Sequence, residues 1–341
     1  MNVPERLIDV ELTNRCNALC TFCPRDETPD QGFMPFDTFK QVVARVKELE
    51  IFPRISFTGQ GESLLHPQVE EFIRYATAEG VEVMMTTNAN LLTPQRSRSL
   101  LDAGLKGICF SISDTEEDYE LVYNLDFETT RNNALAFLEI ARDEYAERNV
   151  ESAVSIVIHD LNQDKVDEYS AYWHAAGVGE TFKFEQNNRG GACDNSHYFI
   201  ESDRFQDEAR ELLAKRKVTT LCSAPFYFVF IGWSGQYYIC CSDYRKTDPL
   251  GSVFEYSIDA MDQVKLETFA RRPQACAQCN IDPVNGVREK MFEMEQGEAE
   301  QAELDLFIKQ QRMFYQPRLP TDLDPLNWEA SLPSGIIARE I

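Results

Sequence analysis

The sequence predicts an α/β fold in which six parallel strands alternate with helices, followed by a small hairpin-plus-helix unit. Through residue 217, short apolar runs alternate with segments of helical periodicity. Strands that alternate with helices form parallel βα units, and their crossovers are right-handed. Because six units are too few for the eight of a closed barrel, we expect an open, partial (β/α)6 barrel.

The six predicted strands are short runs rich in apolar residues at 7–12, 54–58, 81–86, 107–112, 153–158 and 181–185. Asp37 is the expected N-cap of a first helix with apolar residues at helical spacing up to Leu49. Further helices are expected at 67–80, 92–103, 127–145, 163–176 and 203–217, several with Pro near the start or Gly at the end.

A β-hairpin is predicted after the sixth unit, where Tyr227–Ile231 and Gln236–Ile239 flank Trp233-Ser234-Gly235. A helix at about 258–270 would return the chain to a Cys-x2-Cys pair. Residues 288–314 have a helical pattern, and the chain is irregular after Pro317. The expected division is a barrel core at 1–217, a small second domain at 218–285, and a tail at 286–341 with no assigned chemistry.

Composition excludes several classes of protein. The chain has 341 residues and a net charge of −24, which argues against a general nucleic-acid binder because such proteins need a basic surface. No apolar run reaches the roughly eighteen residues of a membrane span, and the N-terminus lacks a secretory signal. We therefore expect a cytoplasmic protein whose ten cysteines serve metal ligation more than disulfides.

Three cysteines, Cys16, Cys20 and Cys23, follow the first predicted strand. Three thiolates this close can hold three irons of a [4Fe–4S] cluster and leave the fourth iron open to a small molecule. A zinc site usually has a fourth Cys or His nearby, but no histidine precedes His66. A disulfide would leave an odd thiol, so the cluster is favoured.

The Cys-x3-Cys-x2-Cys pattern after strand one, with Phe22 before the last cysteine, resembles the radical S-adenosylmethionine (SAM) superfamily. The resemblance supports the partial barrel. It also implies that SAM binds the open iron through its amino and carboxylate groups and is cleaved to methionine and a 5′-deoxyadenosyl radical. A reductant such as flavodoxin or ferredoxin would supply the electron.

The same resemblance implies SAM-binding residues at the ends of the strands. Gly61 and Glu62 match a Gly-Gly-Glu-like motif that binds the methionyl amino group, although Gln60 departs from it; the glycines would let a ligand approach the backbone. The other candidates are Phe22 for adenine, Asn88 after strand three, Ser111 at the end of strand four with Ser113 close behind, and Arg189 for the SAM carboxylate or the substrate.

Purely structural interpretations of these residues stay open. The Gly-rich segment could be an ordinary βα turn, Asn88 a turn residue, and Arg189 a surface arginine. The four histidines form no metal pattern and are expected to be structural; they are His66, His159, His174 and His197.

A second cysteine set lies in the hairpin unit: Cys222, Cys240, Cys276 and Cys279. Alone it would favour zinc, although a four-thiolate iron–sulfur cluster also fits. Its Cys-x12-Gly-x4-Cys spacing resembles the SPASM domain family. Since no cysteine follows Cys279, the resemblance is to the shortened "twitch" version, which implies one fully ligated auxiliary [4Fe–4S] cluster.

Three cysteines remain outside these sets. Cys241 could be a ligand in place of Cys240, a bystander, or a hydrogen-atom donor, and we take it with Arg189 as a candidate catalytic residue. Cys109 is expected in the core, and Cys193 has no assignment.

Together the resemblances imply oxidation of an alcohol of a sugar, aminocyclitol or nucleoside in natural-product biosynthesis, with the auxiliary cluster as electron acceptor. The chain begins only a few residues before strand one, without a leader-peptide-binding domain, which favours a small-molecule substrate. The alternatives are epimerisation with Cys241 returning the hydrogen, decarboxylation, carbon–carbon bond formation, peptide modification, or a non-enzymatic zinc- or iron–sulfur-binding module.

Overall fold

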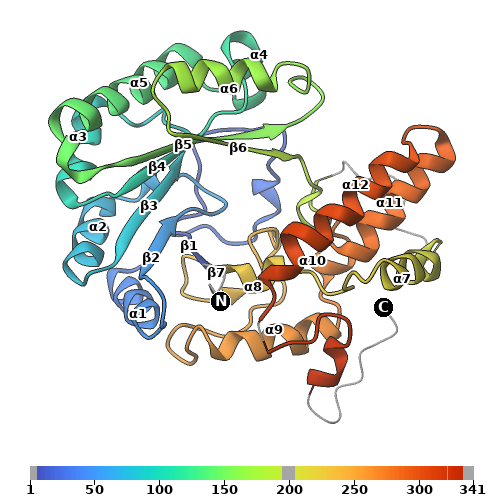
Figure 1. The fold of residues 1–341 in the computed structure, drawn as a ribbon. Helices are drawn as coiled ribbons and strands as arrows, with labels where there is room; N and C mark the ends of the chain where they lie inside the picture. The colour runs from blue at the N-terminus through green and yellow to red at the C-terminus, as the bar shows by residue number, and fades with distance from the viewer. Residues whose placement is uncertain (1–5, 194–203, 321, 333–341) are drawn as a thin grey trace.

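The computed structural model describes residues 6–193, 204–320 and 322–332, and a single curved sheet runs through them (Figure 1). The strand order is β6-β5-β4-β3-β2-β1-β7-β8, and the first six strands are parallel to their neighbours. The predicted partial barrel is therefore confirmed. Its strands are β1 (Leu7–Val10), β2 (Arg54–Phe57), β3 (Glu82–Thr87), β4 (Gly107–Ser111), β5 (Glu151–Ile158) and β6 (Glu180–Glu185).

Helices cover the outer face of this sheet (Figure 1). They are α1 (Phe36–Lys47), α2 (Val69–Ala78), α3 (Pro94–Ala103), α5 (Phe127–Glu144) and α6 (Val166–Ala175). A short helix, α4 (Glu116–Tyr123), was not predicted, because its acidic first turn gives only a weak amphipathic pattern. The prediction of Asp37 as an N-cap is wrong: Pro35 is the N-cap, and Asp37 lies in the first turn, where a carboxylate favours the helix dipole.

The inner face of the barrel carries polar side chains on several strands. Side chains alternate along a strand, so the buried apolar residues of β1–β4 pack under the helices and the alternate positions face the interior. The strand register aligns Asp9 of β1 with Ser56 of β2, and Ser111 of β4 with Ser155 of β5. These inward-facing positions leave a polar wall at the carboxyl ends of the strands, where α/β proteins bind their ligands.

The predicted hairpin consists of β7 (Phe228–Ile231) and β8 (Tyr237–Tyr238), and it extends the barrel sheet. All four residues of β7 pair in parallel with β1. The segment after β8, residues 240–246, then contacts the inner side of β1: Lys246 forms an ion pair with buried Glu11. The second cysteine set is thereby attached directly to the strand that precedes the first set.

Helices α8 (Ala224–Tyr227), α9 (Ala260–Ala270) and α10 (Gln274–Ala277) complete this C-terminal unit. The single helix expected at 288–314 is instead α11 (Pro283–Gln296) and α12 (Gln301–Gln310), separated at Gly297 with φ 77°. Together with α7 (Gln206–Lys215) they enclose a second small core (Figure 1). No helix in the described ranges has the length and apolar character needed to cross a bilayer.

Candidate functional site

The loop that carries Cys16, Cys20 and Cys23 is held from two sides. The Arg25 guanidinium donates to the backbone oxygens of Cys16 (3.3 Å) and Ala18 (2.8 Å). The N–H groups of Leu19 and Thr21 donate to carbonyls at the end of α4, both at 3.0 Å. The unpredicted helix α4 is thus part of the support for the cysteine loop.

The three thiols of this loop are neighbours of one another. Cys20 interacts electrostatically with both Cys23 and Cys16, and the Ala18 N–H donates to the Cys16 sulfur at 3.4 Å. Burial raises the pKa of Cys16 to about 11 and raises that of Cys20 further. In the described part of the chain, no three His, Cys, Asp or Glu side chains are drawn together as ligands of a single metal ion. The thiol donor set fits an iron–sulfur cluster with one iron open.

The glycine-rich turn after β2 packs directly on the cysteine loop. The Glu62 N–H donates to the Arg15 carbonyl at 2.8 Å. A Cβ at Gly61 would lie 2.6 Å from that same carbonyl oxygen and closer still to that of Thr13. Gly61 therefore lets the cysteine loop approach the turn, and its contact with a ligand stays a prediction.

The Glu62 carboxylate is buried at the centre of this arrangement, only 3% exposed. It accepts hydrogen bonds from the Leu64 N–H (3.0 Å), the Thr87 hydroxyl (2.9 Å) and the Asn88 N–H (2.8 Å). Burial raises the pKa of Glu62, while these three donors oppose the rise. Glu62 also interacts electrostatically with Cys16, so the structure brings it to the first cysteine set. A carboxylate has about four acceptor sites, which leaves capacity for a ligand ammonium.

Asn88 and Phe22 also lie against the cysteine loop. The Asn88 amide donates to the Asn17 side chain at 2.9 Å. The Phe22 ring packs on Tyr123 (centroids 5.7 Å apart) and on His159 (5.9 Å). Both predicted residues are therefore close to the thiols, although both also support the loop itself.

The two candidate serines differ in their surroundings. The Ser113 hydroxyl is fully buried and is bound by the Tyr123 hydroxyl and the Val157 N–H, both at 2.9 Å, so it is structural. Ser111 lies on the inner wall, aligned with Ser155 and only partly buried. Ser111 thus keeps its place as the candidate for contact with a ligand.

A His–Asp pair beside Phe22 was missed from the sequence. His159, after β5, lies 3.1 Å from the Asp114 carboxylate, after β4, and both side chains are almost fully buried. The other Asp114 oxygen has no hydrogen-bond partner among the described residues. The signal was the position of both residues just after adjacent strands.

The second cysteine set encloses one cavity. Cys222, Cys240, Cys276 and Cys279 all line it, and Cys241 does not. Burial raises the pKa of each of these four thiols, and that of Cys279 to about 11. Backbone N–H groups close to three of the sulfurs oppose this rise: Ala224 at Cys222, Ser242 at Cys240, and Ile281 at Cys279. Hydrogen bonds to thiolate sulfur are a feature of iron–sulfur sites, so this donor set fits a four-thiolate cluster.

The loop after β6 is docked on this second set. Asn188 and Asn280 exchange hydrogen bonds, from the Asn188 N–H (3.0 Å) and from the Asn280 N–H (3.2 Å). Gly190, with φ 64°, has no room for a side chain, because a Cβ would lie 2.9 Å from the Ser242 carbonyl oxygen. This contact fixes the position of the neighbouring Arg189.

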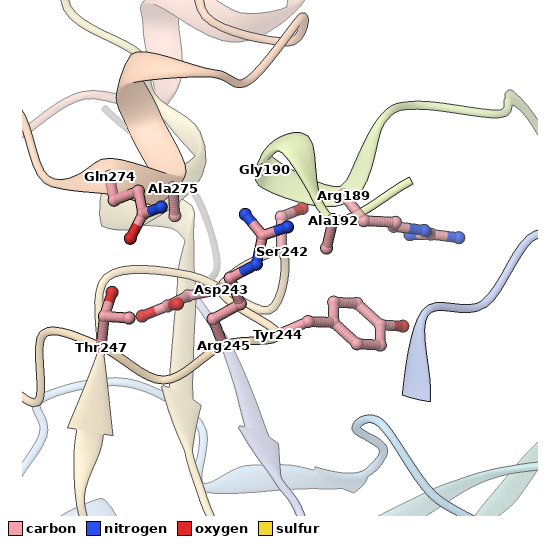
Figure 2. A pocket seen from close by; sticks show the side chains of 10 residues that line it. All are labelled: Arg189, Gly190, Ala192, Ser242, Asp243, Tyr244, Arg245, Thr247, Gln274 and Ala275. Atoms are coloured by element: carbon pink, nitrogen blue, oxygen red, sulfur yellow. The ribbon is translucent and has the colours of Figure 1, made fainter. Parts of the chain in front are cut away.

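Arg189 and Cys241 lie between the two cysteine sets. Arg189 interacts electrostatically with Tyr244, Cys241 and Cys23, and its buried Nε has no hydrogen-bond partner among the described residues. The Tyr244 hydroxyl lies 3.7 Å from the Cys23 sulfur. Figure 2 shows the Arg189 and Tyr244 side chains extending the same way from a small pocket, away from Asp243 and Thr247. The surface-arginine alternative for Arg189 is therefore wrong.

Asp9 is a further residue that sequence reasoning missed. It lies on the inner wall, is 7% exposed, and interacts electrostatically with Cys241. Burial raises its pKa to about 8. The signal was the alternation in Leu7–Glu11, which puts two acids on one face of a strand.

Two family models match the chain. Residues 10–170 match the model described as the radical SAM superfamily. Residues 222–280 match SPASM, an iron–sulfur cluster-binding domain.

Curated relatives align over part of their length. The PqqA peptide cyclase of Bradyrhizobium diazoefficiens is 25% identical over 248 residues, 67% of this chain and 62% of the cyclase. The tungsten-containing aldehyde ferredoxin oxidoreductase cofactor-modifying protein of Pyrococcus furiosus is 24% identical over 172 residues, 50% of this chain and 48% of the relative. The chain thus spans less than two thirds of the length of these relatives.

Solved structures share the fold. Native anSMEcpe with bound AdoMet is 13% identical with a TM-score of 0.58, covering 89% of this chain and 98% of that chain. SuiB of Streptococcus suis bound to the precursor peptide SuiA is 11% identical with a TM-score of 0.60, covering 83% of this chain and 71% of that chain.

Replacement of Gly61 by Ala should displace the cysteine loop, because the added Cβ meets backbone atoms that cannot rotate away. We expect a loss of roughly 1–3 kcal/mol of stability, as for other overpacked sites, and less iron bound after anaerobic reconstitution. The control is Gly80→Ala, which has open space but φ 78° and should cost about 1 kcal/mol without losing iron. Equal iron content in the two variants would contradict this role.

Replacement of Asp9 by Asn should stabilise the protein in a pH-dependent way. Because burial raises the pKa of folded Asp9 from 3.8 to about 8, the folded state binds the proton more tightly than the unfolded state. The contribution of Asp9 to the stability of the folded state is therefore greatest below about pH 4, and it falls as the pH rises towards 8. In urea unfolding, the free energy of unfolding of the variant should exceed that of the parent by an amount that grows by roughly 1.4 kcal/mol per pH unit from pH 6 to 8 and then levels off. The control is Asp160→Asn, which changes an exposed residue and should differ from the parent by an amount that does not depend on pH. A difference between Asp9→Asn and the parent that is equally independent of pH would contradict the prediction.

Proposed function

The chain is a radical SAM enzyme with a C-terminal SPASM-type iron–sulfur domain, and we propose that it oxidises an alcohol of a sugar, aminocyclitol or nucleoside. In this proposal the substrate loses a hydrogen atom from carbon, then one electron and one proton, and becomes two hydrogens lighter. SAM takes up one electron and the hydrogen atom, and leaves as methionine and 5′-deoxyadenosine.

We propose that Cys16, Cys20 and Cys23 hold the SAM-binding [4Fe–4S] cluster. Glu62 would accept a hydrogen bond from the SAM ammonium. The preceding residue, Gly61, allows the turn that carries Glu62 to pack closely on the cysteine loop. Phe22, Asn88 and Ser111 would contact the rest of SAM, because they line the same end of the barrel.

The auxiliary [4Fe–4S] cluster would be held by the cysteines that share one cavity, namely Cys222, Cys240, Cys276 and Cys279. When bound, the first cluster supplies the electron for SAM cleavage and the auxiliary cluster can accept the electron from the substrate. Since Cys241 does not line that cavity, we propose that its thiol is free to face the substrate.

One observation carries this proposal: Arg189 and Cys241 lie between the two cysteine sets, with Tyr244 close to Cys23. A substrate held there would face both sets of thiols. Arg189 can bind an oxygen-rich group through its unsatisfied Nε–H. Ionised Asp9 can accept the proton, because a carboxyl with a pKa of about 8 exchanges protons near neutral pH.

The polar inner wall favours a hydroxylated small molecule. Ser56 of β2 faces the interior, as do Ser111 and Ser155 on the neighbouring strands β4 and β5, and these hydroxyls offer donors and acceptors to a substrate's hydroxyl groups. A reductant such as flavodoxin or ferredoxin would complete the reaction.

Peptide modification is the second candidate. Phe182 and Phe184 project from β6 on the inner side, aligned with Ser155 and Val157, and they are 49% and 43% exposed. β6 is an edge strand of the described sheet, and an exposed edge can pair with an extended peptide. A peptide cyclase among the relatives, and a related fold bound to a precursor peptide, support this alternative.

The test is a substrate panel of sugars, aminocyclitols, nucleosides and peptides, incubated in deuterated water with reconstituted, reduced enzyme and SAM. A substrate should accelerate 5′-deoxyadenosine formation, and its product should be two hydrogens lighter without deuterium at carbon. Cys241→Ala should form the same product, because the thiol does not return a hydrogen in an oxidation.

A product of unchanged hydrogen count with one carbon-bound deuterium, lost in Cys241→Ala, would instead establish epimerisation. Acceleration by peptides alone would favour the second candidate.

A further inference from the structure

Lys265 is a buried lysine that the proposed function does not use. It lies in α9, and its side chain is inaccessible to solvent. Its ammonium donates a hydrogen bond to the Pro225 carbonyl. Asp262, one turn earlier, interacts electrostatically with Lys265 but forms its ion pair with Arg6, and no acid in the described ranges forms an ion pair with Lys265.

A buried ammonium in this state requires an explanation. An ammonium has three donors, and burial without an anionic partner is strongly unfavourable. Burial lowers the pKa of Lys265 to about 8, so the amine still carries its proton at pH 7. Because Asp262 is shared with Arg6, and because buried charges in proteins are usually paired or lie beside metal centres, we expect a further counter-charge near Lys265.

Lys265 lies beside the cavity of the second cysteine set. Pro225, its hydrogen-bond acceptor, lines the cavity of the second cysteine set. Lys265 also interacts electrostatically with Cys240, which lines the same cavity. The acid in the cavity wall, Asp282, lies 3.6 Å from Arg272 and already has a cation. Lys265 is thus a buried cation beside this cavity that forms no ion pair with a carboxylate within the described residues.

We propose that Lys265 is the counter-ion of the auxiliary cluster and raises its reduction potential. Four thiolates give the bound cluster a net negative charge, which grows on reduction. A cation held nearby at low dielectric stabilises the reduced form more than the oxidised form. The inference rests on the proposed function and deepens it, because a higher potential favours electron transfer from the substrate to this cluster.

The test measures the auxiliary cluster alone, in the 341-residue chain with Cys16, Cys20 and Cys23 replaced by Ala. After anaerobic reconstitution and iron analysis, the potential is measured by redox titration followed by electron paramagnetic resonance. Lys265→Met and Lys265→Gln remove the charge, and Gln keeps a donor for the Pro225 carbonyl. Lys265→Arg keeps the charge. Arg271→Met is the matched control, since it removes a charge from an exposed site at the end of the same helix.

The expected result is a lower potential in Lys265→Met and Lys265→Gln, with Lys265→Arg and Arg271→Met close to the parent. Loss of the cluster from both neutral variants, with retention in Lys265→Arg, would equally support a counter-ion. A parent-like potential in Lys265→Met, or loss of the cluster from Lys265→Arg as well, would overturn the proposal and leave Lys265 a packing role. A parent chain that takes up no iron at the second cysteine set would instead overturn the proposed function.

Discussion

The parallel pairing of β7 with β1 is the constraint on which the rest of the site depends. β1 leads into the first cysteine loop, and β7 belongs to the hairpin between the first and second cysteines of the second set. Their pairing joins the strand before the first cysteine set to the hairpin of the second set, although the two sets are more than two hundred residues apart in sequence. The ion pair of Lys246 with Glu11 and the contact of Gln60 with the Asp243 carbonyl, at 3.0 Å, join the same segments.

Burial of charge is the second recurring feature of this site. Four ionisable side chains of the site have atoms where solvent is largely excluded: Glu62, Asp9, Arg189 and Lys265. Glu62 is compensated by three hydrogen-bond donors, whereas Asp9 and Lys265 are not compensated by an ion pair in the described structure. Charges that destabilise the fold in this way are typical of functional sites, which is why we assign them roles toward the substrate and the clusters.

Much of the fold follows from local patterns. The six barrel strands and most of their helices were predicted within a few residues, because apolar periodicity and Gly or Pro boundaries are local signals. The sequence could not show that the hairpin joins β1, since its turn specifies the β7–β8 pair but not the outer neighbour of β7. The break at Gly297 was overlooked inside a continuous helical pattern, although a glycine with positive φ commonly ends a helix.

The site was only partly predictable because many of its contacts join residues that are distant in sequence. The cysteine motifs predict both thiol sets, but spacing alone could not decide between Cys240 and Cys241; of the two, only Cys240 lines the cavity, which supports Cys240 as the proposed ligand. The role of Gly61 as a contact for the cysteine loop and the surroundings of Asp9 and Lys265 depend on residues distant in sequence. Long-range packing of this kind leaves no local pattern.

The most direct test of the account is whether the purified chain cleaves SAM. After anaerobic reconstitution it should bind about eight irons, as two four-iron clusters, and on reduction it should convert SAM to 5′-deoxyadenosine and methionine. Replacing Cys16, Cys20 and Cys23 with Ala should leave about four irons and abolish 5′-deoxyadenosine formation. Zinc without iron in the purified protein, or unchanged SAM cleavage in the triple variant, would contradict the account.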